Sequence, residues 1–200
     1  MKLSIIMPTI SGREESCATM VAAYLDRTPG VELEIINPKD YPSWPAGCNA
    51  GQLLATGDVL HFAADDLEPL PGWSEPMLRC VGAGEIPAPQ LWDFVKGDGL
   101  PVNQAADGIP GSCTAFSRVP SMTRAMAEAI GPWPLMDYYG DNWVSDAARK
   151  LGWETRIMEG YAFVHHWHPV GRLDAGDWVG RSLPAYNAER ARLGLGPVGR

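Results

Sequence analysis

The segment "DVLHFAADDLEPLPGW" (58–73) joins an apolar run directly to two adjacent carboxylates and then closes with prolines and a glycine. The run 58–64 predicts a buried strand. Asp65 and Asp66 at its end are unfavourable there, because buried carboxylates cost several kcal/mol unless a cation or hydrogen bonds compensate them. We therefore expect a positively charged partner at these two side chains.

Strand and helix signals alternate before this segment. The predicted elements are a strand over 3–9, a helix over 11–28 with Ser11 as N-cap, a strand over 31–37, a loop over 38–47, a short helix over 48–56 and the strand over 58–64. This alternation predicts an α/β fold with a mainly parallel sheet and helices on both faces. In such sheets ligands bind beyond the carboxyl ends of the strands, where the two carboxylates lie.

The second half of the chain is less regular. Its predicted elements are a helix over 72–81, a strand over 86–94, a loop over 95–110, a strand over 111–118, helices over 119–131 and 140–152, and one or two closing strands over 154–168.

The composition is that of one ordinary globular domain. Of 200 residues, 46% are hydrophobic and 20% charged, which is enough for a sizeable core. The opening "MKLSIIMPTI" is too short an apolar run for a secretory signal, and we expect a cytoplasmic protein without a membrane span. The four cysteines form no CxxC pair and predict buried free thiols rather than a zinc site or a disulfide framework.

The net charge of −8 comes from the first half of the chain. Residues 1–100 carry 14 acidic and 6 basic side chains, whereas residues 101–200 carry 10 of each. This distribution argues against a general polyanion binder. An acidic site that recruits a metal cation and a merely solvated acidic surface both fit it.

Five pieces of sequence carry a family resemblance. They are, in order, "LSIIMPTI", "CNAGQLLATGDVLHFAADDLEPLPGW", "GSCTAFSR", "YYGDNWVSDAARKLGW" and "FVHHWHP". Together they resemble an inverting glycosyltransferase of the GT-A fold, of the family-2-like kind, over roughly residues 3–170. The resemblance implies a single GT-A domain over 1–171 and metal-dependent transfer of a sugar from a nucleotide-diphosphate sugar to a hydroxyl acceptor.

The resemblance also implies a metal site with a DxD-type motif. The matching tripeptide is Ala64-Asp65-Asp66, which lacks the first acidic position and leaves Asp66 as the metal ligand. Carboxylate oxygens suit Mg²⁺ or Mn²⁺ bound to a diphosphate. Similar enzymes often place a late histidine on the metal; in an extended strand His166 and His168 share one face, so His166 is the first candidate and His168 the second. An imidazole ligand favours Mn²⁺ over Mg²⁺.

Asp141 is the candidate general base. The segment "YYGDNWVSDAARKLG" resembles the family's "ED" segment, with Gly140 where the family often has Glu. An inverting transfer needs a carboxylate to take the proton of the acceptor hydroxyl. An N-cap role explains an Asp at a helix start without any catalysis.

Donor contacts are implied at several strand and helix ends. The resemblance assigns Pro8 and Thr9 to the nucleotide-binding edge after the first strand, together with Asp65. Asn37 can hydrogen-bond a nucleobase, which leaves the nucleotide open. Asn49 matches the family's "N-x-G", although a helix-start role explains it almost as well.

Residues 172–200 lie outside the resemblance. This tail holds five Arg and three acidic residues and has a helix-like stretch. It is expected to close over the donor, contact an acceptor or pack as an interface. Among the tryptophans beside the motifs, one or two are expected to face a ligand, and Trp73 is expected to be structural.

Two other functions fit the same residues. The first is a GT-A-like protein that binds a nucleotide or sugar without turnover, which the incomplete DxD motif suggests. The second keeps the transfer but places it on a macromolecule, either a protein or DNA with a hydroxylated base. The acceptor is thus left open between a small molecule, a protein and modified DNA. The acidic balance argues against DNA, and the Arg content of the tail favours it.

Overall fold

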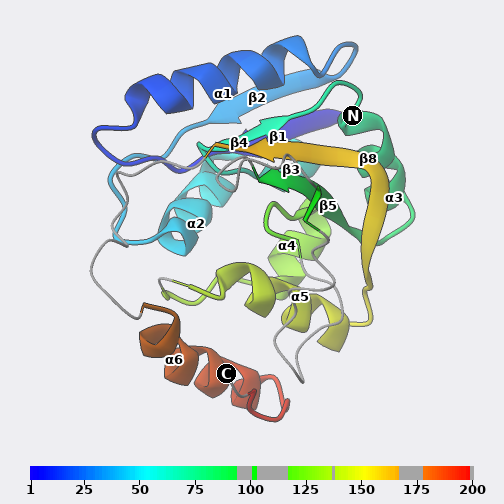
Figure 1. Cartoon of the computed structure of the whole chain (residues 1–200). Coiled ribbons are helices and arrows are strands. Elements are labelled where there is room, and N and C mark those ends of the chain that lie inside the picture. Colours follow the sequence, from blue (N-terminus) through cyan, green and yellow to red (C-terminus); the bar gives the residue numbers. More distant parts are fainter. Residues whose placement is uncertain (94–100, 103–116, 137, 167–177, 199–200) are drawn as a thin grey trace.

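A mainly parallel sheet forms the centre of the protein (Figure 1). The computed structural model describes residues 1–93, 101–102, 117–136, 138–166 and 178–198. The sheet has the order β2-β1-β3-β7, with β1 (Lys2–Ile6), β2 (Glu32–Ile36), β3 (Val59–Phe62) and β7 (Ser121–Thr123). β1 pairs in parallel with β2 and β3, while β7 is antiparallel to β3. The predicted mainly parallel sheet flanked by helices is confirmed.

A second sheet, which the sequence did not predict, has the order β4-β8-β5-β6. Its strands are β4 (Leu67–Pro69), β5 (Ile86–Asp93), β6 (Pro101–Val102) and β8 (Thr155–His165). β4 begins directly after Asp66 and pairs with the end of β8, where Leu67 lies opposite His165. The pairing continues as the backbone N–H of His166 donates to the carbonyl of Asp66 at 2.8 Å. The end of β8 therefore lies beside the two carboxylates.

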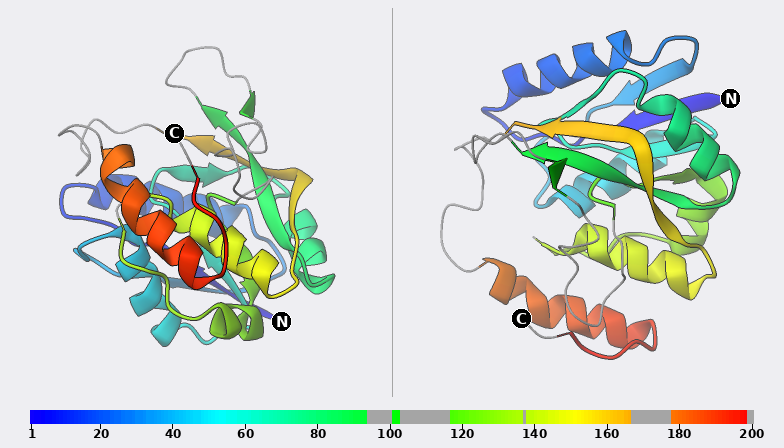
Figure 2. Two further views of the ribbon diagram at one scale, coloured as in Figure 1. Left: turned by 90° about the horizontal axis from the view of Figure 1, so that it is seen from below. Right: turned by 45° about the vertical axis from the view of Figure 1, so that its right-hand side comes forward.

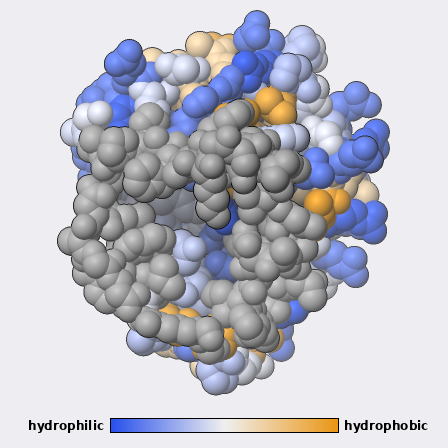
Figure 3. Space-filling model, viewed as in Figure 1, coloured by the Kyte–Doolittle hydropathy of each residue, from blue (hydrophilic) through white to orange (hydrophobic). Residues whose placement is uncertain are grey.

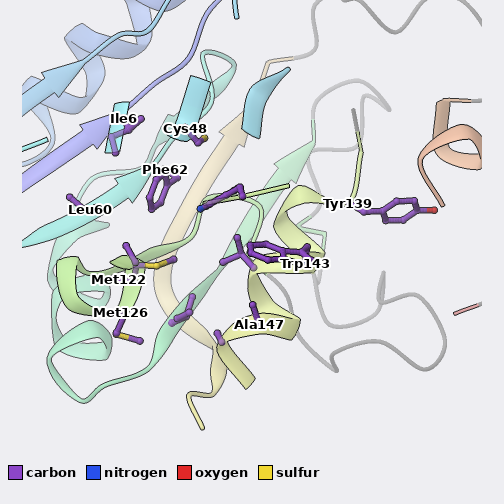
Figure 4. Packing of buried hydrophobic residues seen from close by; sticks show 14 of the residues in the cluster. Ile6, Cys48, Leu60, Phe62, Met122, Met126, Tyr139, Trp143 and Ala147 are labelled. Atoms are coloured by element: carbon purple, nitrogen blue, oxygen red, sulfur yellow. The ribbon is translucent and has the colours of Figure 1, made fainter. Parts of the chain in front are cut away.

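Helices cover both faces of the central sheet (Figures 1 and 2). They are α1 (Glu14–Asp26), α2 (Trp44–Leu54), α3 (Ser74–Gly82), α4 (Arg124–Ile130) and α5 (Gly140–Lys150), and the last helix, α6 (Trp178–Arg192), lies outside α5. β3 is buried on both sides: Val59 packs in the cluster with α1 and α3, and Phe62 in the cluster with α2, α4 and α5. Figure 4 shows the second cluster, where Phe62, Met126 and Trp143 come from a strand and two helices.

Two predicted helix starts are wrong. α2 begins at Trp44 and not at 48, because Ser43 Oγ accepts a hydrogen bond from the Ala46 N–H and a proline stands in the first turn. α1 begins at Glu14, so Ser11 is not its N-cap. Ser11 instead donates its N–H and its hydroxyl to the Asp40 carboxylate.

The helix predicted over 119–131 is shorter than expected. Its first part is strand β7, and Thr123 caps α4 by accepting a hydrogen bond from the Met126 N–H. In the strand predicted over 111–118, residues 111–116 lie outside the described residues and residues 117–118 are not a strand.

The tail helix α6 packs against α5 in all views (Figures 1 and 2). Arg190 forms an ion pair with Asp146 of α5, and both side chains are almost fully buried. The Tyr186 hydroxyl donates to the same carboxylate at 2.6 Å. Removing one partner of a buried ion pair is costly, so this contact fixes α6 on the domain.

The described surface is mostly hydrophilic on the face shown in Figure 3, with hydrophobic residues in small separate groups. Among the described helices none has the length and apolar character that crossing a bilayer requires. Cys17, Cys48 and Cys80 are buried free thiols, as expected, and Cys113 lies outside the described residues.

Candidate functional site

A cavity of about 220 Å³ lies where β3 ends and where α2 and α5 begin. Two carboxylates, two basic side chains and three aromatic side chains contribute to its lining: Asp66, Asp141, Arg118, His165, Trp44, Tyr138 and Tyr139. The predicted metal ligand and the predicted base thus face one space, although they come from distant parts of the chain. A cavity with these groups suits a polar ligand with an apolar ring face.

Asp65 is held from two sides after β3 ends. The hydroxyl of Thr9, after β1, donates to its carboxylate, and the hydroxyl of Ser16 on α1 donates to its backbone carbonyl at 2.6 Å. β1 and β3 are parallel neighbours, so the residues after them meet at one sheet edge. Burial raises the pKa of Asp65 and outweighs the Thr9 hydrogen bond and the nearby Arg13 charge.

The positive partner that the sequence predicts is present as Arg13. Its Nη2 lies 3.0 Å from Asp65 Oδ1 and 3.0 Å from Asp66 Oδ2. Burial would raise the pKa of Asp66, but interactions with His165 and Arg13 outweigh it and leave the pKa below its ordinary value. Asp66 is therefore a compensated carboxylate.

The structure brings the side chain of His165, and not that of His166, to the carboxylate of Asp66. His165 Nε2 lies 3.8 Å from Asp66 Oδ2 and lines the cavity, whereas His166 Nε2 lies 2.6 Å from Glu68 Oε2. The two neighbouring side chains do reach different carboxylates, but the face toward Asp66 is that of His165, the last residue of β8, and not that of His166. His168 lies outside the described residues.

Two of these residues suit a divalent cation. Across the described ranges no three His, Cys, Asp or Glu side chains gather closely enough to enclose a metal. Asp66 and His165 form a pair at the cavity instead. Mg²⁺ and Mn²⁺ sites that act on phosphates use few protein ligands and take the remaining ligands from phosphate oxygens and water. The pair fits such a site, with the imidazole favouring Mn²⁺.

Asp141 lies in the first turn of α5 and lines the cavity. Tyr139 is the N-cap and adopts the left-handed conformation, with φ 70°. Asp141 Oδ1 accepts the Asn142 N–H at 2.9 Å, but Asp141 itself is not the N-cap, so the capping alternative is wrong. Burial raises the pKa of Asp141, with the nearby Arg118 charge acting in the opposite direction. A raised pKa is what a general base requires.

Gly140 leaves room for the start of α2. A Cβ built on Gly140 would lie 3.0 Å from Cγ of Pro45, which also lines the cavity. A larger side chain, such as the Glu expected from the resemblance, would crowd Pro45. Close packing against Pro45 therefore explains why glycine stands at position 140 instead of the Glu that the resemblance implies.

The remaining donor candidates already have protein partners. Pro8 is buried, and a Cβ on Gly47 of α2 would lie only 2.6 Å from it. Asn37 Nδ2 donates to the Met7 carbonyl at 2.5 Å and to Cys17 Sγ at 3.1 Å. These contacts tie the ends of β1 and β2 together at the same sheet edge as Asp65.

Asn49 lies inside α2 and not at its start. Its Nδ2 donates to the Trp133 carbonyl at 2.9 Å, and the Trp133 N–H donates to its Oδ1 at 2.8 Å. Both ends of the amide are thus engaged by one backbone unit. Two residues further along, a Cβ on Gly51 would lie 2.3 Å from Ile6 Cγ2, so only glycine allows this close approach of α2 to β1. The "N-x-G" segment therefore combines the hydrogen bonds of Asn49 to Trp133 with a close helix–strand contact.

Comparisons with known proteins show the fold. No family model and no curated protein sequence matches this chain. The crystal structure of S. aureus TarS, a glycosyltransferase, matches with a TM-score of 0.66 and 13% identity. The chain therefore has a GT-A-like fold, shared with this structural neighbour. The match covers 94% of this chain and 39% of the TarS chain, so the protein spans well under half the length of this structural neighbour.

Three residues at this site were not assigned from the sequence. Arg13 and Arg118 carried no local motif, and the alternation of an extended strand placed His165 on the face opposite to the candidate His166. The position of Arg13 could have been predicted, because the residues that follow two neighbouring parallel strands meet at one edge of the sheet. Trp44, one of the tryptophans beside the motifs, lines the cavity and donates Nε1–H to the Ala63 carbonyl at 3.0 Å, while Trp73 is fully buried.

Proposed function

We propose that the protein transfers a sugar from a nucleotide-diphosphate sugar to a hydroxyl acceptor, with inversion at the anomeric carbon. The observation that carries this proposal is that Asp66 and Asp141 line one cavity in a glycosyltransferase-like fold. One carboxylate is available for the cation of a diphosphate, and the other for the proton of an acceptor. Trp44 and Tyr138 supply aromatic faces on which a sugar ring packs.

In the transfer, the acceptor oxygen forms a bond to the anomeric carbon as the bond from that carbon to the diphosphate oxygen breaks. The diphosphate leaves with the electron pair of the broken bond. Asp141 takes the proton of the acceptor hydroxyl. Burial strengthens Asp141 as a base, and the charge of Arg118 helps to keep it ionised before the proton arrives.

We assign the cation to Asp66 and His165, as Mn²⁺ or alternatively Mg²⁺. When bound, such a cation stabilises the negative charge that develops on a departing diphosphate. Thr9 and Asp65 lie beside this pair and belong to the donor side of the site. Pro8, Asn37 and Asn49 act on the same side by fixing the strand ends and α2.

Release of nucleoside diphosphate from a panel of nucleotide sugars tests the proposal. The wild-type protein should release it in the presence of Mn²⁺ and lose this activity with a chelator. Asp66→Asn should abolish release, and His165→Ala should weaken Mn²⁺ binding more than His166→Ala does. Glu75→Gln, at an exposed position on α3, is the control and should behave as wild type.

The two alternatives give different results in the same system. A protein that binds without turnover would bind a donor in calorimetry but release no nucleoside diphosphate with any acceptor. Small hydroxyl compounds, a protein lysate and duplex DNA with hydroxylated bases are the acceptor classes to compare. Absence of a gel shift with duplex DNA at low salt would remove the DNA acceptor.

A further inference from the structure

Arg13 contacts both carboxylates through a single nitrogen. Its side chain is 14% exposed and lies directly before α1. Nη2 is 3.0 Å from Asp65 and from Asp66, while Nε is buried without a hydrogen-bond partner among the described residues. A guanidinium binds a carboxylate most strongly with two parallel N–H donors. Arg13 offers only one nitrogen to each carboxylate and so does not form this stronger arrangement. Each of these two contacts is therefore weaker than a paired one, and another cation can replace Arg13 in it.

Arg13 holds the Asp66 oxygen that also faces His165. The oxygen is Oδ2, which lies 3.0 Å from Arg13 Nη2 and 3.8 Å from His165 Nε2. A divalent cation bound by Asp66 and His165 would stand close to the guanidinium. Like charges at such distances repel by an amount comparable to a salt bridge, so the two cations compete for this oxygen.

Asp65 can retain its ion pair with Arg13 when a divalent cation binds Asp66. It is more buried than Asp66 and is fixed by Thr9 and Ser16. Two carboxylates and one guanidinium carry a formal charge of −1, which a divalent cation alone would reverse to +1. A diphosphate restores negative charge, so the cation is best accommodated when it arrives with the donor.

We propose that Arg13 occupies the cation position on Asp66 in the metal-free protein and that a divalent cation binds by displacing it onto Asp65 alone. This inference rests on the metal pair of the proposed function. Arg13 is a positioning residue in this scheme, since it acts through the carboxylates. Its effect is to weaken metal binding in the absence of donor.

Mn²⁺ titration followed by the electron paramagnetic resonance of free Mn²⁺ tests the exchange without any turnover. In the absence of donor, Arg13→Gln should bind Mn²⁺ roughly tenfold more tightly than wild type, the effect of one lost charge-assisted hydrogen bond. Arg27→Gln is the matched control: Arg27 pairs with Glu68 at 2.5 Å, so its loss removes the same charge near the site without freeing Asp66. Arg13→Lys should lie between wild type and Arg13→Gln.

The outcomes separate the inference from the metal site itself. Wild-type binding as tight as that of Arg13→Gln would overturn the exchange alone. Equal tightening in Arg13→Gln and Arg27→Gln, lost at high salt, would show a through-space charge effect and also overturn it. No Mn²⁺ binding by any variant would overturn the inference together with the proposed metal. Thermal unfolding of each variant checks the fold, and Arg13→Lys supplies the test if Arg13→Gln does not fold.

Discussion

The ring of Tyr139 stacks on the ring of Tyr186, with centroids 4.9 Å apart and planes inclined by 12°. Tyr139 caps α5 and lines the cavity, whereas Tyr186 belongs to the tail helix α6. Figure 4 shows the Tyr139 side chain directed away from the other labelled core residues and toward α6. The tail therefore supports the helix start that carries Asp141.

Replacement of Tyr186 should show how far this support matters. Tyr186→Ala removes a fully buried ring and should lower the free energy of unfolding by about 3–5 kcal/mol. Tyr186→Phe keeps the stack and removes the hydroxyl, which donates to Asp146 and accepts from Arg190 Nη1 at 3.5 Å, so about 1–2 kcal/mol is expected. Urea denaturation measures both. Equal losses in the two variants would mean that the stack contributes little.

Asn49 can be tested for two alternative roles, because its amide is already hydrogen-bonded to the backbone of Trp133 and is then not available to a donor. Asn49→Ala leaves two backbone groups of Trp133 without partners and should cost about 1–3 kcal/mol of stability. Asn49→Asp keeps the acceptor for the Trp133 N–H but sets a carboxylate oxygen against the Trp133 carbonyl, so its cost should be at least as large. Donor affinity, measured by calorimetry on the folded protein, should not change. A weaker donor with unchanged stability would assign Asn49 to the donor instead.

The strands β1, β2 and β3 of the central sheet were predictable because their signals are local, whereas β7 lies where a helix was predicted. An apolar run ended by carboxylates, prolines and a glycine identifies β3 without knowledge of its neighbours. β4 has only three residues and gains its identity from pairing with β8, far along the chain. The choice between His165 and His166 depends on which face of β8 is turned toward Asp66, and the long-range pairing of β4 with β8 sets that face. The Arg190–Asp146 pair is likewise visible only once α6 is placed on α5.

His61 makes the core sensitive to acid. It is fully buried on β3, where hydrogen bonds join Nε2 to the Tyr24 hydroxyl at 2.9 Å and Nδ1 to the Ser121 hydroxyl at 2.7 Å. Burial lowers its pKa from 6.5 to about 3. The unfolded chain therefore binds a proton between these values that the folded protein does not, and stability falls as the pH drops through this window.

Comparison with His61→Phe isolates this contribution. Between pH 6 and pH 4 the wild type should lose roughly 1.4 kcal/mol per pH unit more than the variant, because only the wild type carries this proton linkage. Urea denaturation at several pH values gives the difference. Parallel pH profiles for the two proteins would show that His61 does not remain neutral in the fold.

Asp141→Asn tests the base assignment directly. Asn keeps the size of the side chain and an oxygen for the Asn142 N–H, so the fold and the donor affinity should be retained. Turnover should fall roughly 10²–10⁴-fold, as expected when proton transfer loses its acceptor. Because burial raises the pKa of Asp141 above 3.8, wild-type turnover should decline with acid at a pH above that value, and the variant should lack this decline. Asp58→Asn, at an exposed position, is the control. Near-normal turnover in Asp141→Asn would remove the base from the mechanism and favour binding without transfer.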